Sequence, residues 1–168
     1  MNYANVSANG YYKDILGNDQ FRSAQSGGIC FVSYGIVEKC TNYGTIEGAY
    51  SVGGIVGYNY AGIINYVINY GKVVQNYSDN LYNDYKGIGG IAGYCQCGKI
   101  YNSLNAGDIG NRSGIIGYNY YYDSIVKNCV NVGKARFGIC EHVAEGYIVD
   151  CYYLNSASET GAPESQYT

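Results

Sequence analysis

The sequence predicts an all-β fold, a short parallel β-solenoid of about five coils of roughly 24 residues each, with two excursions. Three observations carry this prediction. The 168-residue chain contains 25 Gly and 23 Tyr but one Pro and no Trp, a bias typical of repeats. A Gly-Ile corner recurs, and each copy is followed by a turn that begins with Asn. The Ile-, Val- and Tyr-rich pieces between glycines are too short for helices but suit strands.

The isoleucines of the Gly-Ile corners set the period of the repeat. They lie at Ile29, Ile55, Ile91, Ile115 and Ile139, at intervals of 26, 36, 24 and 24 residues. Stacked coils place equivalent residues above one another, so we expect these side chains to form an inward apolar ladder. Each burial is worth on the order of 1.5 to 3 kcal/mol.

Asparagine marks the second turn of each coil. The marks are Asn42, Asn69, Asn105 and Asn131, with a degraded copy at Asn155. In a stack of coils this column can pass side-chain amide hydrogen bonds from one coil to the next, as stacked Asn rows do in cross-β assemblies. The glycines are expected to supply positive φ at corners or room for close backbone approach.

The chain is predicted to be a single domain whose coils lie near residues 27–52, 53–88, 89–112, 113–137 and 138–157. Residues 1–26 are expected to form a partial coil plus an excursion, because Asn2 to Val6 resembles the half-unit that begins at Asn42. A second excursion lies within 74–87, and 158–168 is expected to be a loop or linker tail. The open coil edge at Asn2 predicts that neighbouring coils or domains of a longer chain pack there.

Seven cysteines, an odd number, raise the questions of disulfides and metals. Five of them occupy positions at which other coils carry Val, Ala, Ile or Ser, and are predicted to be reduced core thiols: Cys30 and Cys140 in one column, and Cys40, Cys129 and Cys151 in another. Cys95 and Cys97 lie at a turn, where oxidation stays open. Cys-x-Cys with one distant His142 is a poor zinc ligand set, so no metal and no cofactor are expected.

The repeat resembles a known bacterial motif. Residues 53–59 (Gly-Gly-Ile-Val-Gly-Tyr-Asn), 62–65 (Gly-Ile-Ile-Asn) and 69–73 (Asn-Tyr-Gly-Lys-Val) look like the GLUG motif repeat, and the resemblance extends over about residues 27 to 157. That family occurs in large secreted or wall-attached bacterial proteins, among them adhesin-like proteins and the non-catalytic region of immunoglobulin A peptidases. The resemblance implies an extracellular or cell-surface location.

The catalytic motifs that the sequence suggests are incomplete or lie in the wrong structural context. A His-Glu-x-x-His zinc protease needs two histidines, and the chain has one. Residues 87–92 match a dinucleotide-binding pattern by letter, but they align with the other corners and open no helix. Cys140 and His142 would share one face of a strand without a third orienting group. A non-enzymatic protein is therefore predicted, with a carbohydrate-active enzyme or glycan-binding β-helix as the alternative, because paired carboxylates cannot be recognised from sequence distance.

Function is expected where the chain departs from the repeat. The second excursion combines aromatic rings with oxygen ligands, and its candidate ligand-binding residues are Tyr77, Asp79, Tyr82, Asp84 and Tyr85. The expected partner is a host glycan or an extracellular protein; a purely structural spacer is the further alternative. The net charge of −3 has no basic run, which argues against nucleic acid. No apolar run is long enough for membrane insertion, and the N-terminus lacks the features of a signal peptide.

Overall fold

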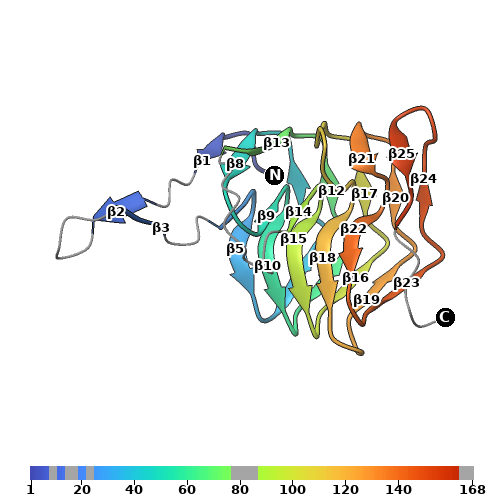
Figure 1. Cartoon of the computed structure of the whole chain (residues 1–168). Coiled ribbons are helices and arrows are strands. Elements are labelled where there is room, and N and C mark those ends of the chain that lie inside the picture. The colour runs from blue at the N-terminus through green and yellow to red at the C-terminus, as the bar shows by residue number, and fades with distance from the viewer. Residues whose placement is uncertain (8–10, 14–18, 22–24, 77–86, 163–168) are drawn as a thin grey trace.

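The computed structural model describes residues 1–7, 11–13, 19–21, 25–76 and 87–162. These residues form strands and turns without a helix, and the parallel strands stack into a β-solenoid of about five turns (Figure 1). The predicted fold class is therefore confirmed. Within the described ranges there is no helix that could cross a bilayer.

Three parallel five-stranded sheets run along the solenoid, and each coil contributes one strand to each sheet. Sheet 1 contains β5 (Cys30–Ser33), β10 (Val56–Tyr60), β15 (Ala92–Gln96), β18 (Ile116–Tyr120) and β22 (Cys140–Val143). Sheet 2 contains β6 (Ile36–Glu38), β11 (Ile63–Asn65), β16 (Lys99–Tyr101), β19 (Ile125–Lys127) and β23 (Tyr147–Val149). Sheet 3 contains β7 (Thr41–Asn42), β12 (Ile68–Asn69), β17 (Leu104–Asn105), β20 (Val130–Asn131) and β24 (Tyr152–Tyr153).

Shorter sheets close the coil between sheet 3 and the next strand of sheet 1. One contains β1 (Val6–Ser7), β8 (Ile46–Gly48) and β13 (Val73–Gln75); another contains β4 (Ser26–Gly27), β9 (Val52–Gly53) and β14 (Ile88–Gly89). β21 (Ala135–Phe137) pairs in parallel with β25 (Ser158–Thr160). The expectation of a loop from residue 158 onward is thus wrong for 158–160, because this segment continues the stack.

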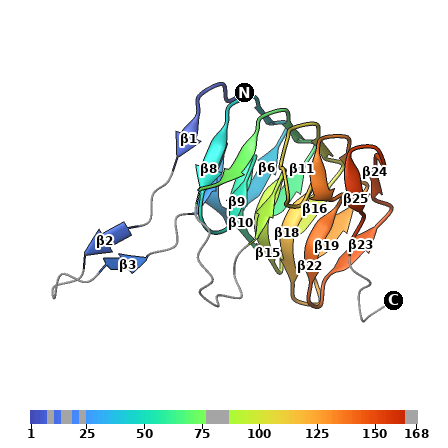
Figure 2. The same cartoon turned by 45° about the horizontal axis from the view of Figure 1, so that its top comes forward.

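The N-terminal residues form the expected partial coil. Val6 pairs with Ile46, and Asn2 bridges to Asn42. The first excursion contains an antiparallel hairpin, β2 (Tyr11–Lys13) and β3 (Asp19–Phe21), which lies away from the solenoid (Figure 2).

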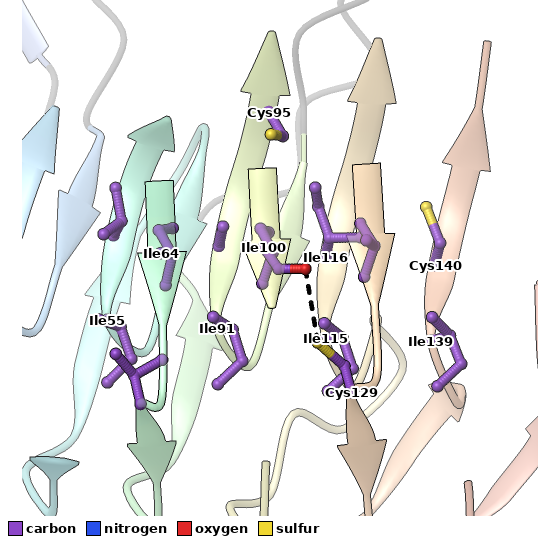
Figure 3. Packing of buried hydrophobic residues seen from close by; sticks show 14 residues of the cluster. Ile55, Ile64, Ile91, Cys95, Ile100, Ile115, Ile116, Cys129, Ile139 and Cys140 are labelled. Carbon is purple, nitrogen blue, oxygen red and sulfur yellow. Dashed lines mark hydrogen bonds between the residues drawn. The ribbon is translucent and has the colours of Figure 1, made fainter. Parts of the chain in front are cut away.

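The core is a stack of aliphatic side chains inside the coils. Ile55, Ile91 and Ile115 are fully buried and Ile139 nearly so, one above another along the axis (Figure 3). Ile29, the fifth predicted member, is 38% exposed. It belongs to the first complete coil. The described residues of the partial coil before it pair with β7 and β8 and not with β5, so among the described residues Ile29 lacks the stacked neighbour that buries the other four.

The asparagine column forms a continuous ladder of hydrogen bonds. Asn42, Asn69, Asn105 and Asn131 are fully buried. Nδ2 of each donates to Oδ1 of the next, at 2.9, 2.8 and 2.7 Å in chain order. Asn2 Nδ2 donates to Asn42 Oδ1 at one end, and Asn131 Nδ2 donates to Ser158 Oγ at the other. The predicted ladder is present and extends one residue further at each end.

The ladder ends differently from the sequence expectation. Asn131 pairs with Tyr153, so Asn155 does not occupy the column. The Tyr153 ring lies against Gly138, at the place where the Asn side chain lies against the corner glycine in the other coils. Tyr153 therefore closes the column at the last complete coil.

The described glycines mainly allow the backbones of neighbouring coils to approach closely, and a positive φ is seldom the reason for them. A Cβ on Gly71 would lie 2.0 Å from the Gly44 carbonyl oxygen, and one on Gly107 would lie 2.0 Å from that of Gly71, so no side chain fits there. Among the described glycines only Gly110 has positive φ. The left-handed corner between sheets 2 and 3 is instead made by non-glycine residues in every coil: Lys39, Tyr66, Asn102, Asn128 and Asp150.

Candidate functional site

The excursion predicted to bind a ligand lies outside the described residues. This holds for Tyr77, Asp79, Tyr82, Asp84 and Tyr85. The described chain before it ends just after β13, and the chain resumes just before β14. The candidate surfaces described below lie on the outer faces of the described coils.

Exposed tyrosines gather at the turn from sheet 1 to sheet 2. We call this surface the aromatic corner; it consists of the exposed Tyr34, Tyr60, Tyr121 and Tyr122 and the half-buried Tyr120. The Tyr34 and Tyr60 rings are 5.4 Å apart at 54°, and the Tyr120 and Tyr121 rings are 4.5 Å apart at 77°. Tyr34 is 74% exposed and Tyr122 64%. Aromatic faces with a polar hydroxyl suit both the apolar and the polar sides of a sugar.

The solenoid positions these rings by register. Tyr60 pairs with Gln96 and Gln96 with Tyr120, so the three form one column over adjacent coils. Tyr34 follows Ser33, which pairs with Asn59, and therefore lies beside Tyr60. Gln96 accepts a hydrogen bond from the Tyr58 hydroxyl. The column thus presents an amide between aromatic rings.

The fourth coil enlarges the corner. Two residues separate Tyr60 from β11, whereas four separate Tyr120 from β19. In the longer turn Tyr121 has a φ of 76°, and the Ser124 amide donates to the Tyr121 carbonyl at 3.0 Å. The extra residues carry Tyr121 and Tyr122, which are exposed. The sequence signal that could have revealed this surface is the repeated Gly-Tyr-Asn-Tyr at 57–60 and 117–120.

A second row of rings runs along the outer side of sheet 1. The Tyr94 ring lies 5.0 Å from Tyr58 and 5.1 Å from Tyr118, and Tyr118 lies 4.5 Å from His142. Tyr94 is only 2% exposed. This row packs against the aromatic corner. The ring centroids of Tyr58 and Tyr60 are 6.0 Å apart, and those of Tyr118 and Tyr120 are 5.9 Å apart.

A third group, next to the asparagine ladder, has a different geometry. Tyr43 stacks on Tyr3 at 4.8 Å and 4°, and on Tyr70 at 5.2 Å and 11°. Both faces of the Tyr43 ring are therefore occupied by other rings. This stack exposes ring edges and hydroxyls, so it is better suited to stiffening the edge of the solenoid than to stacking a ligand.

Cys140 and His142 do not form a nucleophile pair. The pairing of β18 with β22 skips the second residue of each strand, so that Cys140 pairs with Ile116 and His142 pairs with Tyr118. Cys140 is fully buried in the core, whereas His142 lies outside on the Tyr118 ring. The expectation that both share one face is wrong, because the in-and-out alternation of the strand is interrupted between Cys140, which is buried, and His142, which is exposed. Burial raises the pKa of the Cys140 thiol to about 12, which leaves it protonated.

All seven cysteines are free thiols. The predicted columns are correct, since Val56 pairs with both Cys30 and Ala92, and Ile116 with Cys140. Cys95 is fully buried, with its pKa raised by burial to about 12, and replaces Asn59 and Asn119 in its column. The pKa of Cys129 is raised by its hydrogen bond with Cys151 and by burial.

In the part of the chain that the structure describes, no group of three His, Cys, Asp or Glu side chains is placed to hold a metal ion. Comparisons of the chain with family models, with curated proteins and with solved structures gave no match.

Proposed function

We propose that the chain is a non-enzymatic repeat segment of a bacterial cell-surface or secreted protein, which acts as a rigid spacer and presents a glycan-binding surface at the aromatic corner. The observation that carries the proposal is the in-register column of Tyr60, Gln96 and Tyr120 on a scaffold locked by the asparagine ladder. Rings held by register need no ordering on binding, which removes one cost of association. The resemblance to the GLUG motif supports the cellular location.

The glycan part is tested with the purified chain on a panel of neutral and acidic glycans, followed by calorimetric titration of those that bind. Replacing two open rings, Tyr34→Ala with Tyr60→Ala, is expected to weaken binding about tenfold. Tyr152→Ala is the matched control: Tyr152 is 66% exposed but lies on sheet 3, away from the aromatic corner. Equal affinity of the double variant and the control would refute the aromatic corner as the binding surface.

The location is tested separately on intact cells that produce the full-length protein. Antibodies against the folded chain are expected to label unpermeabilised cells or to detect the protein in the medium. Labelling that requires permeabilisation would contradict the surface proposal. Release of reducing sugar from any bound glycan during the titrations would instead favour the carbohydrate-active alternative.

A further inference from the structure

A hollow on the side of the solenoid next to β13 and β21 gathers charges that are far apart in the sequence. It has a volume of about 490 Å³, within the range of ligand pockets. Its lining includes four of the ten cationic residues of the chain, Lys72, Arg112, Lys134 and Arg136, against two anionic ones, Asp108 and Glu141. An adjoining hollow of about 710 Å³ shares Lys134 and Arg136 and extends to Ser156 and Glu159. We call the two together the basic groove.

The groove exists because the third coil makes a turn where its neighbours have strands. The Asp108 side chain accepts a hydrogen bond from the Gly110 amide at 2.9 Å, and Gly110 has a φ of 60°. Coils two and four have β13 and β21 at this level. The turn leaves an open channel between these strands, with the exposed Asn111 side chain at its edge.

One wall is a row of alternating charges on successive coils. The Val73 amide donates to the Asp108 carbonyl at 3.0 Å, and the Ile109 amide donates to the Lys134 carbonyl at 2.7 Å. These bonds set Lys72, Asp108 and Lys134 in one column, about 4.8 Å apart. Both lysines are exposed, and neither makes an ion pair within 4.0 Å among the described residues. Two ammonium groups are therefore free to meet an anion.

The other wall is a fixed guanidinium. Arg112 Nη1 pairs with Glu141 Oε1 at 2.9 Å, while its Nε donates to Gln75 Oε1 at 3.1 Å and its Nη2 donates to the same oxygen. Three of the five guanidinium N–H groups are used in this way, so two remain for a ligand. Glu141 Oε2 has no hydrogen-bond partner among the described residues. That oxygen is buried, so the wall offers a ligand the remaining guanidinium N–H groups of Arg112 and not the Glu141 carboxylate.

This combination favours a ligand that carries both anions and hydroxyl groups. The lysines and Arg112 match a carboxylate or sulfate, whereas Asp108 requires a hydroxyl donor. A nucleic acid carries a phosphate at every nucleotide and would meet repulsion at Asp108, Glu141 and Glu159, and no aromatic ring of the described residues lines either hollow on which a base could stack. We propose that the basic groove binds an acidic oligosaccharide, with its anionic group on the ammonium ends of Lys72 and Lys134, which extend beyond the shorter Asp108 side chain, and its hydroxyls on Asp108 and Asn111.

This site shares no lining residue with the aromatic corner, so the two can fail independently. The test titrates the full chain by calorimetry with four probes: a galacturonic acid tetrasaccharide, a heparin tetrasaccharide, the neutral galactose tetrasaccharide and a short single-stranded DNA. Binding of either acidic sugar, with the neutral one at least tenfold weaker, is the expected result. Stronger binding of the galacturonic acid probe would assign a carboxylate as the anion, whereas stronger binding of heparin, which carries both groups, would show that sulfate contributes.

The deciding variant is the double substitution Lys72→Gln with Lys134→Gln, which removes the two unpaired cations and leaves the Arg112 contacts in place. We expect its affinity for the acidic sugar to fall about tenfold or more. Lys99→Gln with Lys127→Gln is the matched control, because it removes the same charge from adjacent strands of sheet 2; its affinity should change less than about twofold. Thermal unfolding of each variant verifies that it is folded.

Four results would overturn the proposal: neither acidic sugar binds at about 1 mM, the neutral sugar binds equally well, the control variant loses as much affinity as the groove variant, or the DNA binds most tightly. Loss of neutral-glycan binding in the Tyr34→Ala with Tyr60→Ala variant, together with unchanged acidic-sugar binding, would place the two sites apart. Loss of acidic-sugar binding in this variant, together with unchanged neutral-glycan binding, would exclude the groove as the site for the acidic sugar.

Discussion

Asn69 donates its side-chain amide to Asn105 on the next coil at 2.8 Å, and Asn105 donates in turn to Asn131 at 2.7 Å. The Asn105 side chain also donates to the carbonyl of Gly107, two residues later in its own coil, and accepts from the Gly107 amide. Asn105 therefore satisfies two donors and two acceptors in a fully buried position. An Asn-x-Gly turn supplies both partners within one coil, so the motif and the ladder are one structure.

Replacing Asn105 by Ala is expected to lower the free energy of unfolding by about 3 to 5 kcal/mol, because Asn69, Asn131 and Gly107 each lose a buried partner. Urea unfolding followed by circular dichroism measures the loss. Asn65→Ala is the control: Asn65 is half-buried and accepts one side-chain bond, from Asn102, so its removal should cost less than about 1 kcal/mol. Similar losses in both variants would contradict the ladder as a main source of stability.

Gly107→Ala is expected to prevent the third coil from packing. Its Cβ would lie 2.0 Å from the Gly71 carbonyl oxygen, which is backbone and cannot move aside, and the loss should exceed about 3 kcal/mol. At Gly35 a Cβ meets nothing within 4 Å and φ is not positive. Gly35→Ala should therefore be neutral or stabilise the fold by up to about 1 kcal/mol. The melting temperatures of the two variants decide the matter; a tolerated Gly107→Ala would show that the coils separate more easily than the contacts imply.

The buried thiol of Cys140 predicts a loss of stability at alkaline pH. Its folded-state pKa is raised by burial to about 12 from an ordinary value of 9.0. The stabilisation from keeping this thiol neutral is complete below about pH 9, and it decreases between pH 9 and 12 because only the unfolded chain ionises. From pH 8 to pH 10 the loss should be about 1.4 kcal/mol.

Cys140→Val tests this loss with a side chain that the same column already carries at Val56. Urea midpoints at pH 8 and pH 10 should differ less in the variant than in the parent chain. All other side chains are the same in both proteins, so the comparison isolates Cys140. An identical pH dependence in the two chains would show that the thiol ionises without unfolding.

Cys129 and Cys151 are expected to form a disulfide when the protein is oxidised. They precede Val130 and Tyr152, which pair in register on β20 and β24, so their Cα atoms lie at strand spacing, about 4.8 Å apart, which a disulfide can bridge. Treatment with diamide should yield a protein with one disulfide, located by peptide mass mapping. Cys151→Ser should remain fully reduced under the same conditions; a bond from Cys129 to any other cysteine would contradict the register.

The sequence predicted the repeating features well because they are local. Asn-x-Gly and Gly-Ile recur at nearly constant spacing, so their columns followed from counting. Ile29 was misjudged because burial depends on a neighbouring coil, which a single motif does not encode. Tyr153 was missed for a related reason: it takes the place of an asparagine without resembling one, and only the register of β24 shows the substitution.

The surfaces were less predictable, for a physical reason. Four basic residues of the groove lie far apart along the chain: Lys72, Arg112, Lys134 and Arg136. Coil stacking brings residues roughly one coil length apart side by side. A charge survey that treats the sequence as linear cannot detect such a cluster. The aromatic corner was partly visible in the Gly-Tyr-Asn-Tyr repeat, but its exposure depends on the longer turn in the fourth coil.

The asparagine ladder also gives the solenoid an electrical direction. Every amide from Asn2 to Asn131 donates toward the C-terminal coil, and every one after Asn2 also accepts from the amide on its N-terminal side. Their dipoles therefore add along the axis, as peptide dipoles add in a helix, with the positive end at Ser158. A coil that extended this ladder would have to offer an acceptor at one end and a donor at the other, so two identical ends could not join through it.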